Sequence, residues 1–353
     1  MMGSTFVHTA VQADNKARVM AALNAHPFRP AWWLAHRHLQ TCWSPLFRRR
    51  PAVPLEHERV DTPDGDFLDL YHCQGDPGKP GVVLLHGLEG TLNSFYIPAI
   101  NNVFHELGWN VTTMMFRTCG TELNRACRAY HMGETSDLAF LMNLLHERHP
   151  DRPFYIAGVS LGANVLLKWL GELNDAAPPH IRGAAAISPP FDPAAGIEQF
   201  HREFFGLYAK KFLRTLLPKA LEKERQFPGC IDAQKVRACT DFYVYDTEVT
   251  ARLHGYDDAW DYWRRVGCGQ FLPHVRVPTL LLTSRDDPFN PAHTIPGELV
   301  EASHHLHPQW TDRGGHVGFV GGRLPWQPAY WMEAQVRRFF TAYDAIRLEQ
   351  NRD

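Results

Sequence analysis

Three side chains of the kinds used in nucleophilic catalysis occur along this chain in the order serine, aspartate, histidine. Ser160 is the central residue of a Gly-Val-Ser-Leu-Gly segment at 158–162. An apolar run typical of a strand precedes this segment and a helical pattern follows it, which is the context of a nucleophile elbow. The flanking glycines let the backbone pass close to its neighbours while the serine stays exposed at the turn. The segment therefore predicts a nucleophile; a loop serine between two turn glycines is the alternative.

A serine hydroxyl is a weak nucleophile at neutral pH, so it needs a histidine base that a carboxylate orients. Asp286 and Asp287 come shortly after the apolar run 279–283, and the carboxyl end of a strand is the sheet edge at which ligands bind. The acid of the common turn is followed by two or three residues and then a proline. This spacing favours Asp287, in Asp-Pro-Phe-Asn-Pro, as the orienting acid. Asp286 would then hydrogen-bond within the turn, and it is the alternative acid.

His316 lies in a glycine-rich loop, Gly-Gly-His-Val-Gly-Phe at 314–319, after the last predicted strand. A loop histidine or an Asp-Pro turn by itself is usually structural. Here the serine, the acid and the histidine each follow a predicted strand, and they occur in the chain order known for one class of triad. We therefore predict that Ser160, Asp287 and His316 form a catalytic triad.

Acyl transfer also needs hydrogen-bond donors for the oxyanion of the tetrahedral intermediate. The residue after the nucleophile supplies one backbone N–H, here that of Leu161, and a loop after an earlier strand supplies another. The segment His-Gly-Leu-Glu-Gly at 86–90 follows a continuous apolar run and fits that place. The N–H groups of Leu88 and Leu161 are the predicted oxyanion hole. A glycine-rich turn that only joins strand to helix is the alternative for residues 86–90.

The elements that must position these groups alternate between strand and helix from residue 56 onward. Strand patterns occur at 56–60, 67–72, 82–86, 110–116, 153–157, 183–188, 278–283 and 307–311. Helical patterns occur at 96–107, at 135–148 with Thr135 or Ser136 as its cap, after the elbow, and at about 329–347. Such alternation predicts an α/β fold with a mostly parallel sheet that helices cover on both sides.

Residues 189–265 interrupt this alternation with amphipathic helical patterns and no clear buried strand. We interpret them as a helical cap insertion over the mouth of the site, with its lysines on a solvated face. Residues 56–188 and 266–353 then form the core, and residues 1–55 form an N-terminal arm. We expect the arm to begin with a mobile start and a short helix.

The arm combines aromatic and basic side chains at 26–55, among them Trp32, Trp33, Trp43, Phe47 and the run Arg48-Arg49-Arg50. We interpret this segment as wrapped on the core with its arginines solvated. Contact with a membrane surface is the alternative, because aromatic and basic residues together are typical of interfacial segments.

The composition excludes several classes of protein. The 353 residues are 44% hydrophobic and 21% charged with a formal charge of −2, which indicates an ordinary globular protein and no nucleic-acid partner. The seven cysteines lack C-x-x-C spacing, and an odd number without a secretory signal indicates reduced thiols. We see no signal peptide and no apolar run long enough to span a membrane, so we expect a cytoplasmic protein.

No metal or cofactor is predicted. His304 and His305 are adjacent, so in a strand they point to opposite faces, and no carboxylate or cysteine near them has ligand spacing. The acidic segment 256–261 lacks the calcium-loop pattern and is expected to start a helix.

Several short motifs accompany the elbow, the 86–90 segment and the 314–319 loop. They are His-Leu-Gln-Thr at 38–41, Phe-Arg at 116–117, Asn-Arg at 124–125, Gly-Glu-Thr at 133–135, Leu-His-Gly-Tyr at 253–256 and Asp-Asp-Pro-Phe at 286–289. Together they resemble the YheT-like branch of the α/β-hydrolases, which is related to eukaryotic abhydrolase-domain lipases. The chain departs from the family pattern at Thr118 and Ala163, where glycine is frequent.

The resemblance implies an α/β-hydrolase fold and a serine esterase. Such an enzyme hydrolyses a small-molecule carboxylic ester through an acyl-enzyme intermediate. The matching positions are Ser160, Asp287 (or Asp286) and His316. An acyltransferase with the same triad and a non-catalytic binding protein on the same fold are the alternatives. The apolar segment 204–208, Phe-Phe-Gly-Leu-Tyr, suggests an apolar acyl pocket formed by the cap.

Overall fold

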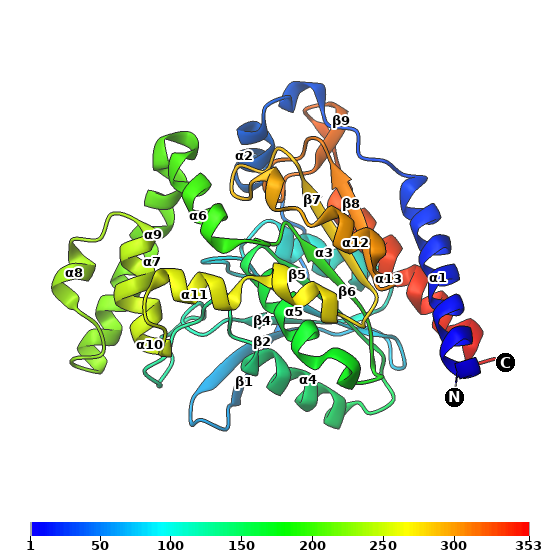
Figure 1. Cartoon of the computed structure of the whole chain (residues 1–353), viewed down its shortest axis with the longest axis horizontal. Helices are drawn as coiled ribbons and strands as arrows, with labels where there is room; N and C mark the ends of the chain where they lie inside the picture. Colours follow the sequence, from blue (N-terminus) through cyan, green and yellow to red (C-terminus); the bar gives the residue numbers. More distant parts are fainter. Residues whose placement is uncertain (1, 353) are drawn as a thin grey trace.

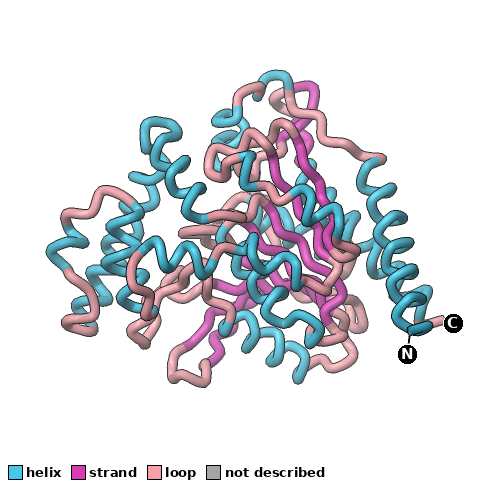
Figure 2. Tube along the Cα trace, viewed as in Figure 1, coloured by secondary structure: helices cyan, strands magenta, loops and turns pink. Residues whose placement is uncertain are grey.

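An eight-stranded sheet lies at the centre of the molecule in the computed structural model, which describes residues 2–352 (Figure 1, Figure 2). Its strands are β1 (Glu56–Asp61), β2 (Phe67–Cys73), β3 (Gly81–Leu85), β4 (Asn110–Met115), β5 (Phe154–Val159), β6 (Ile181–Ile187), β7 (Thr279–Ser284) and β8 (Leu306–Thr311). The spatial order is β1-β2-β4-β3-β5-β6-β7-β8. Only β2 runs in the direction opposite to the other strands, so the predicted mostly parallel sheet is confirmed.

Helices connect the strands and cover both faces of the sheet. They are α1 (Met2–Asn24), α2 (Arg37–Phe47), α3 (Tyr96–His105), α4 (Ser136–Arg148), α5 (Leu161–Leu173), α6 (Pro193–Arg202), α7 (Leu207–Gln226), α8 (Ala233–Arg237), α9 (Phe242–Tyr245), α10 (Arg252–His254), α11 (Ala259–Val266), α12 (Gly297–Ala302) and α13 (Trp331–Gln350). Shorter helical turns are η1 (Trp32–Leu34), η2 (Asn174–Ala176), η3 (Glu203–Gly206), η4 (Asp246–Ala251), η5 (Cys268–His274) and η6 (Ala292–Thr294). The helices α6 to α11 follow β6 and lie to one side of the sheet (Figure 1).

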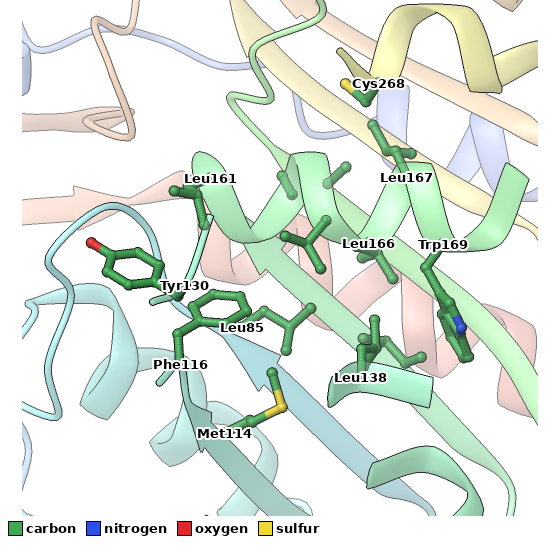
Figure 3. Packing of buried hydrophobic residues seen from close by; sticks show 14 of the residues in the cluster. Leu85, Met114, Phe116, Tyr130, Leu138, Leu161, Leu166, Leu167, Trp169 and Cys268 are labelled. Carbon is green, nitrogen blue, oxygen red and sulfur yellow. The ribbon is translucent and has the colours of Figure 1, made fainter. Parts of the chain in front are cut away.

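The sheet is buried on both faces because its side chains alternate between two apolar clusters. In β3, Val83 and Leu85 belong to the cluster that α4 and α5 cover, whereas Val82 and Leu84 belong to the cluster that α3 and α13 cover. Figure 3 shows part of the first cluster around Leu85. Burial on both faces explains the continuous apolar runs of these strands. The buried strands also fix the ends of the loops that follow them.

Three local features differ from the sequence predictions. The expected short N-terminal helix is one 23-residue helix that begins at Met2 and packs on α13. Thr135 occupies the N-cap position of α4, one of the two predicted, but its side chain donates to Glu172 and caps no backbone N–H, and the Glu134 carboxylate accepts from the Ser136 N–H at 2.9 Å. A hairpin of β9 (Val320–Leu324) and β10 (Gln327–Tyr330) was not predicted, because its short strands carry too few apolar residues. By contrast, the acidic segment at 256–261 starts α11 as predicted, with Asp258 as its cap.

Arg48 differs from the expected solvated arginines of the arm. Its side chain is 9% exposed, forms an ion pair with Glu333 and lies over the ring of Tyr330 at 3.6 Å. The Glu333 carboxylate is itself buried, and a buried charge requires a charged partner. Arg49 and Arg50 are exposed, as expected.

Two further findings concern the chain as a whole. None of the helices within residues 2–352 has the length and apolar character needed to cross a bilayer. All seven cysteines are free thiols, as predicted.

We expect acid to weaken the folded state through buried histidines such as His307. Its Nδ1–H donates to His305 O at 2.8 Å and its Nε2 accepts from the Tyr343 hydroxyl at 2.7 Å. Burial lowers the pKa of His307 to about 3. Below about pH 6.5, His307 is therefore protonated in the unfolded chain but stays neutral in the folded chain. The free energy of unfolding should then fall by about 3 kcal/mol between pH 6.5 and 4 from this group alone.

Urea unfolding of wild type and His307→Gln across this pH range measures the effect. In the variant, the free energy of unfolding should depend less steeply on pH, by a slope equivalent to up to one proton. Replacement of the exposed His293 by Gln serves as the control. Equal slopes for wild type and His307→Gln would contradict the prediction.

Candidate active site

Ser160 lies at the sharp turn between β5 and α5. Its backbone has φ 54° and ψ −115°, which L-residues rarely adopt, and its N–H donates to Ile187 O at 2.8 Å. A Cβ on Gly158 would lie 2.4 Å from Gly162 O, and one on Gly162 would lie 2.6 Å from His86 O. No side chain fits at either position, so the strand–turn–helix elbow depends on both glycines.

His316 lies between Ser160 and Asp287 and hydrogen-bonds both. Its Nε2 is 3.0 Å from Ser160 Oγ, and its Nδ1 is 2.9 Å from Asp287 Oδ2. The ring of Phe289 packs on the imidazole, with 4.2 Å between the ring centroids. When Nδ1–H donates to the carboxylate, Nε2 is left as the acceptor for the serine hydroxyl proton. The three residues that the sequence analysis singled out are thus brought together from three different loops.

Asp287 and Asp286 have different partners. The Asp287 carboxylate accepts from the backbone N–H groups of Phe289 and Asn290, at 2.7 and 3.2 Å, besides bonding His316. The Asp286 carboxylate accepts from the Gly315 N–H at 2.9 Å. The expectation that Asp286 bonds within its own turn is therefore wrong. It bonds across to the histidine loop, because the two loops leave neighbouring parallel strands at the same edge of the sheet.

The loop that carries His316 packs against α2 of the N-terminal arm. The His316 N–H donates to Thr41 Oγ1 at 2.9 Å. A Cβ on Gly315, which has φ 59°, would lie 2.6 Å from the same oxygen, so the contact requires glycine. The Gln40 side chain accepts from the Val320 N–H at 2.8 Å, just beyond the loop. The sequence analysis missed this role of the arm, although the motif at 38–41 was the available signal.

The turn that contains Leu88 is held on both sides by buried tyrosines. The Gly87 N–H donates to the Tyr96 hydroxyl at 2.9 Å, and the Glu89 N–H donates to the Tyr130 hydroxyl at 2.7 Å. Burial keeps the pKa of both tyrosines above the ordinary value, so both remain neutral. No sequence pattern identified these two tyrosines, because the turn and the tyrosines come from separate segments.

His86 also fixes this turn, through two hydrogen bonds of its imidazole ring. Its Nδ1–H donates to Gly87 O at 2.8 Å and its Nε2 accepts from the Phe116 N–H at 3.1 Å. Burial lowers the pKa of His86 to about 4, so the ring stays neutral and keeps both bonds at neutral pH. Within residues 2–352, the Leu88 and Leu161 N–H groups have no hydrogen-bond partner. A Cβ on Gly87 would lie 3.2 Å from Ser160 Cβ, so the turn lies against the elbow.

A cavity of about 680 Å³ opens beside Ser160 and His316. This volume suits a small organic ligand. Most of its lining is apolar or aromatic, and about half of it comes from α2 and from residues 189–265, including Leu46, Phe200, Phe204, Leu207, Tyr208 and Phe212. Two residues of the predicted apolar segment, Phe205 and Gly206, do not line the cavity, and the Phe205 side chain is 89% exposed. The Phe205 backbone, at φ 56°, turns this side chain outward.

The described part of the chain contains no group of three or more His, Cys, Asp or Glu side chains arranged to hold a metal ion.

Residues 80–322 match the protein family described as alpha/beta hydrolase fold. The chain is 34% identical over 321 residues to the Escherichia coli (strain K12) protein named "Putative esterase YheT", covering 90% of this chain and 93% of that protein. It is 30% identical to Phospholipase ABHD3 of Bos taurus, covering 89% of this chain and 78% of that protein. The Pyrococcus furiosus esterase Pf2001 has the same fold, with a TM-score of 0.53 at 16% identity over 82% of this chain and 92% of that one.

Proposed function

Because this chain belongs to the α/β-hydrolase family, in its YheT-like branch of esterase- and lipase-type hydrolases, we propose that it cleaves carboxylic esters through an acyl-enzyme on Ser160. The observation that carries the proposal is the hydrogen-bonded series Ser160–His316–Asp287 beside an apolar cavity. The names of the relatives support the same class of substrate, a small-molecule ester.

In the proposed mechanism Ser160 Oγ attacks the ester carbonyl carbon while His316 Nε2 takes the hydroxyl proton. Asp287 stabilises the imidazolium that forms and holds the ring in the productive tautomer. His316 then gives its proton to the leaving alcohol. A water molecule, deprotonated by the same nitrogen, attacks the acyl-enzyme and releases the acid with Ser160 restored.

The oxyanion of each tetrahedral intermediate is bound by the N–H groups of Leu88 and Leu161 in this proposal. Donors of this kind act most strongly when they are fixed before the reaction and have no other partner. Both conditions support these two groups, since tyrosines and His86 hold the Leu88 turn and neither N–H is otherwise engaged.

Residues 189–265 act as a cap that shapes the acyl site. Support comes from Phe200, Phe204, Leu207, Tyr208 and Phe212, which lie on α6, η3 and α7 and line the cavity. An apolar acyl chain in this cavity would leave water, which is worth about 0.8 kcal/mol per methylene.

Hydrolysis of p-nitrophenyl esters of increasing chain length tests the proposal. We expect kcat/KM to rise about fourfold per added methylene until the cavity is filled. Product analysis with and without an added alcohol separates hydrolysis from acyl transfer. The function would be wrong if no ester in the series were cleaved, and the apolar acyl site would be wrong if acetate were the best substrate.

Thr41→Val should slow catalysis without unfolding the protein. Valine has nearly the same shape but cannot accept the His316 N–H, so the histidine loop loses one anchor. We expect kcat to fall about tenfold, as for one lost hydrogen bond, with KM little changed. Thr215→Val is the matched control, because Thr215 also lines the cavity but bonds only Phe212 O. An equal loss in both variants, or a change confined to KM, would contradict this role.

A further inference from the structure

Most of the large exposed apolar side chains among the described residues come from a few segments, two of which also contribute to the cavity. Of the thirteen large hydrophobic side chains exposed among the described residues, nine come from three segments, 32–47, 204–207 and 324–326. Isolated exposed apolar residues need no explanation, but a group of them marks a contact surface. Six belong to α2 and to the η3–α7 corner: Leu39 near the start of α2, and a group of five, Leu46, Phe47, Phe204, Phe205 and Leu207. We refer to these five residues as the rim.

The helix α2 is joined to the η3–α7 corner by ion pairs and a ring contact. Glu203 of η3 pairs with Arg37 of α2 at 2.5 Å and with His38 at 3.1 Å. The ring of Phe204 lies 5.0 Å from that of His38. These contacts hold α2 beside the η3–α7 corner, and in Figure 1 both lie along the same edge of the molecule. Leu46, Phe204 and Leu207 also line the cavity, so the rim continues into the site.

The most exposed rim residue is held outward by its backbone. Phe204, Phe205 and Gly206 have φ values of 51°, 56° and 71°, three successive left-handed conformations. Aromatic residues rarely adopt this region, and glycine adopts it readily. The turn leaves Phe205 89% exposed, and Phe47 on the α2 side is 65% exposed. Two aromatic side chains therefore project into solvent, one from α2 and one from the η3–α7 corner.

Basic side chains without ionic partners accompany the rim. They are Arg49, Arg50, Lys210, Lys211 and Arg214, all exposed. No ion pair joins any of them to a described residue, whereas Arg37 and Arg48 nearby are both paired. Arg50, Lys211 and Arg214 also line the cavity. The unpaired charge around the apolar tips is thus positive.

We propose that the rim docks on a lipid bilayer that carries anionic headgroups, with Phe47 and Phe205 entering the headgroup–acyl boundary. Apolar tips flanked by Lys and Arg are the chemistry of interfacial binding, and each cation near such a surface adds to the attraction. A protein partner fits less well, because the cores of protein interfaces are depleted of lysine. Docking in this way turns the cavity mouth toward the lipid. The interaction goes beyond ester cleavage and does not require it.

Vesicle sedimentation of the full chain tests the proposal. The background is Ser160→Ala, so that binding is measured without turnover. We expect it to bind vesicles of phosphatidylcholine with about a third phosphatidylglycerol. Binding to phosphatidylcholine alone should be much weaker, and about 1 M NaCl should release the protein by screening. Absence of binding to the anionic vesicles at low salt overturns the proposal.

Rim variants locate the contact. Phe47→Gln combined with Phe205→Asn should weaken binding at least tenfold, and asparagine tolerates the left-handed backbone, so folding is preserved. Arg49→Gln with Lys210→Gln should weaken binding about fivefold per charge removed. Trp260→Gln removes an exposed aromatic of α11, outside the rim, and Arg182→Gln with Arg337→Gln removes two charges elsewhere.

These control variants should bind like the parent, and thermal unfolding should be similar in all of them. Equal binding by the rim and control variants overturns the proposal. So does a rim variant that changes the oligomeric state in light scattering but leaves vesicle binding intact, because the rim would then be an interface between copies.

Discussion

Ser160→Ala should lower kcat for ester hydrolysis by about 10⁴-fold or more, which is the largest effect that we expect of any single substitution. Alanine removes the only atom that can form the acyl-enzyme. It leaves the oxyanion donors and the cavity in place, so any remaining rate should reflect binding alone. The change is small in volume, and it does not affect the Ser160 N–H, which anchors the elbow to Ile187 O.

A fluorophosphonate probe measures the nucleophile directly, since it labels only a serine that a base activates. Wild type should be labelled and Ser160→Ala should not. Ser94→Ala is the matched control because Ser94 also lines the cavity, yet its hydroxyl bonds the Thr91 N–H and not a histidine. Equal labelling of wild type and Ser160→Ala would show that the proposed nucleophile is wrong.

Asp287→Asn should lower kcat by about 10⁴-fold, whereas Asp286→Asn should lower it less than about tenfold. An amide at position 287 can present an N–H to His316 Nδ1, which stabilises the tautomer that cannot take the serine proton. At position 286 the amide oxygen can still accept the Gly315 N–H, so the histidine loop keeps its anchor. The two adjacent substitutions are chemically identical, which makes each the control for the other.

Kinetics with a short p-nitrophenyl ester and thermal unfolding of both variants complete this comparison. If Asp286→Asn were as slow as Asp287→Asn while both remained folded, Asp287 would not be the orienting acid. If Asp287→Asn alone were unfolded, Asp287→Glu would serve as the second variant. It keeps the negative charge but displaces it, so its rate should lie between those of wild type and Asp287→Asn.

The sequence by itself determined the mostly parallel sheet and the residues at the ends of its strands. Apolar runs such as 82–85 predict strands buried on both faces, and that burial is a property of local composition. The elbow at 158–162 was also readable, because glycine at both flanking positions is a local steric requirement. The order serine, acid, histidine then placed the three groups at one edge, since parallel strands share their carboxyl ends.

Only the tertiary structure shows which groups hold the histidine loop and the Leu88 turn in place. Asp286 bonds Gly315, Thr41 bonds His316, and Tyr96 and Tyr130 hold the Leu88 turn. All but the Tyr96 bond join segments far apart in the sequence, and the Thr41 contact spans 275 residues. The same is true of the contact between α2 and the η3–α7 corner, where Glu203 pairs with Arg37 and His38. The local sequence determines which strands are buried and which turns need glycine. These contacts depend instead on how separate loops pack against one another.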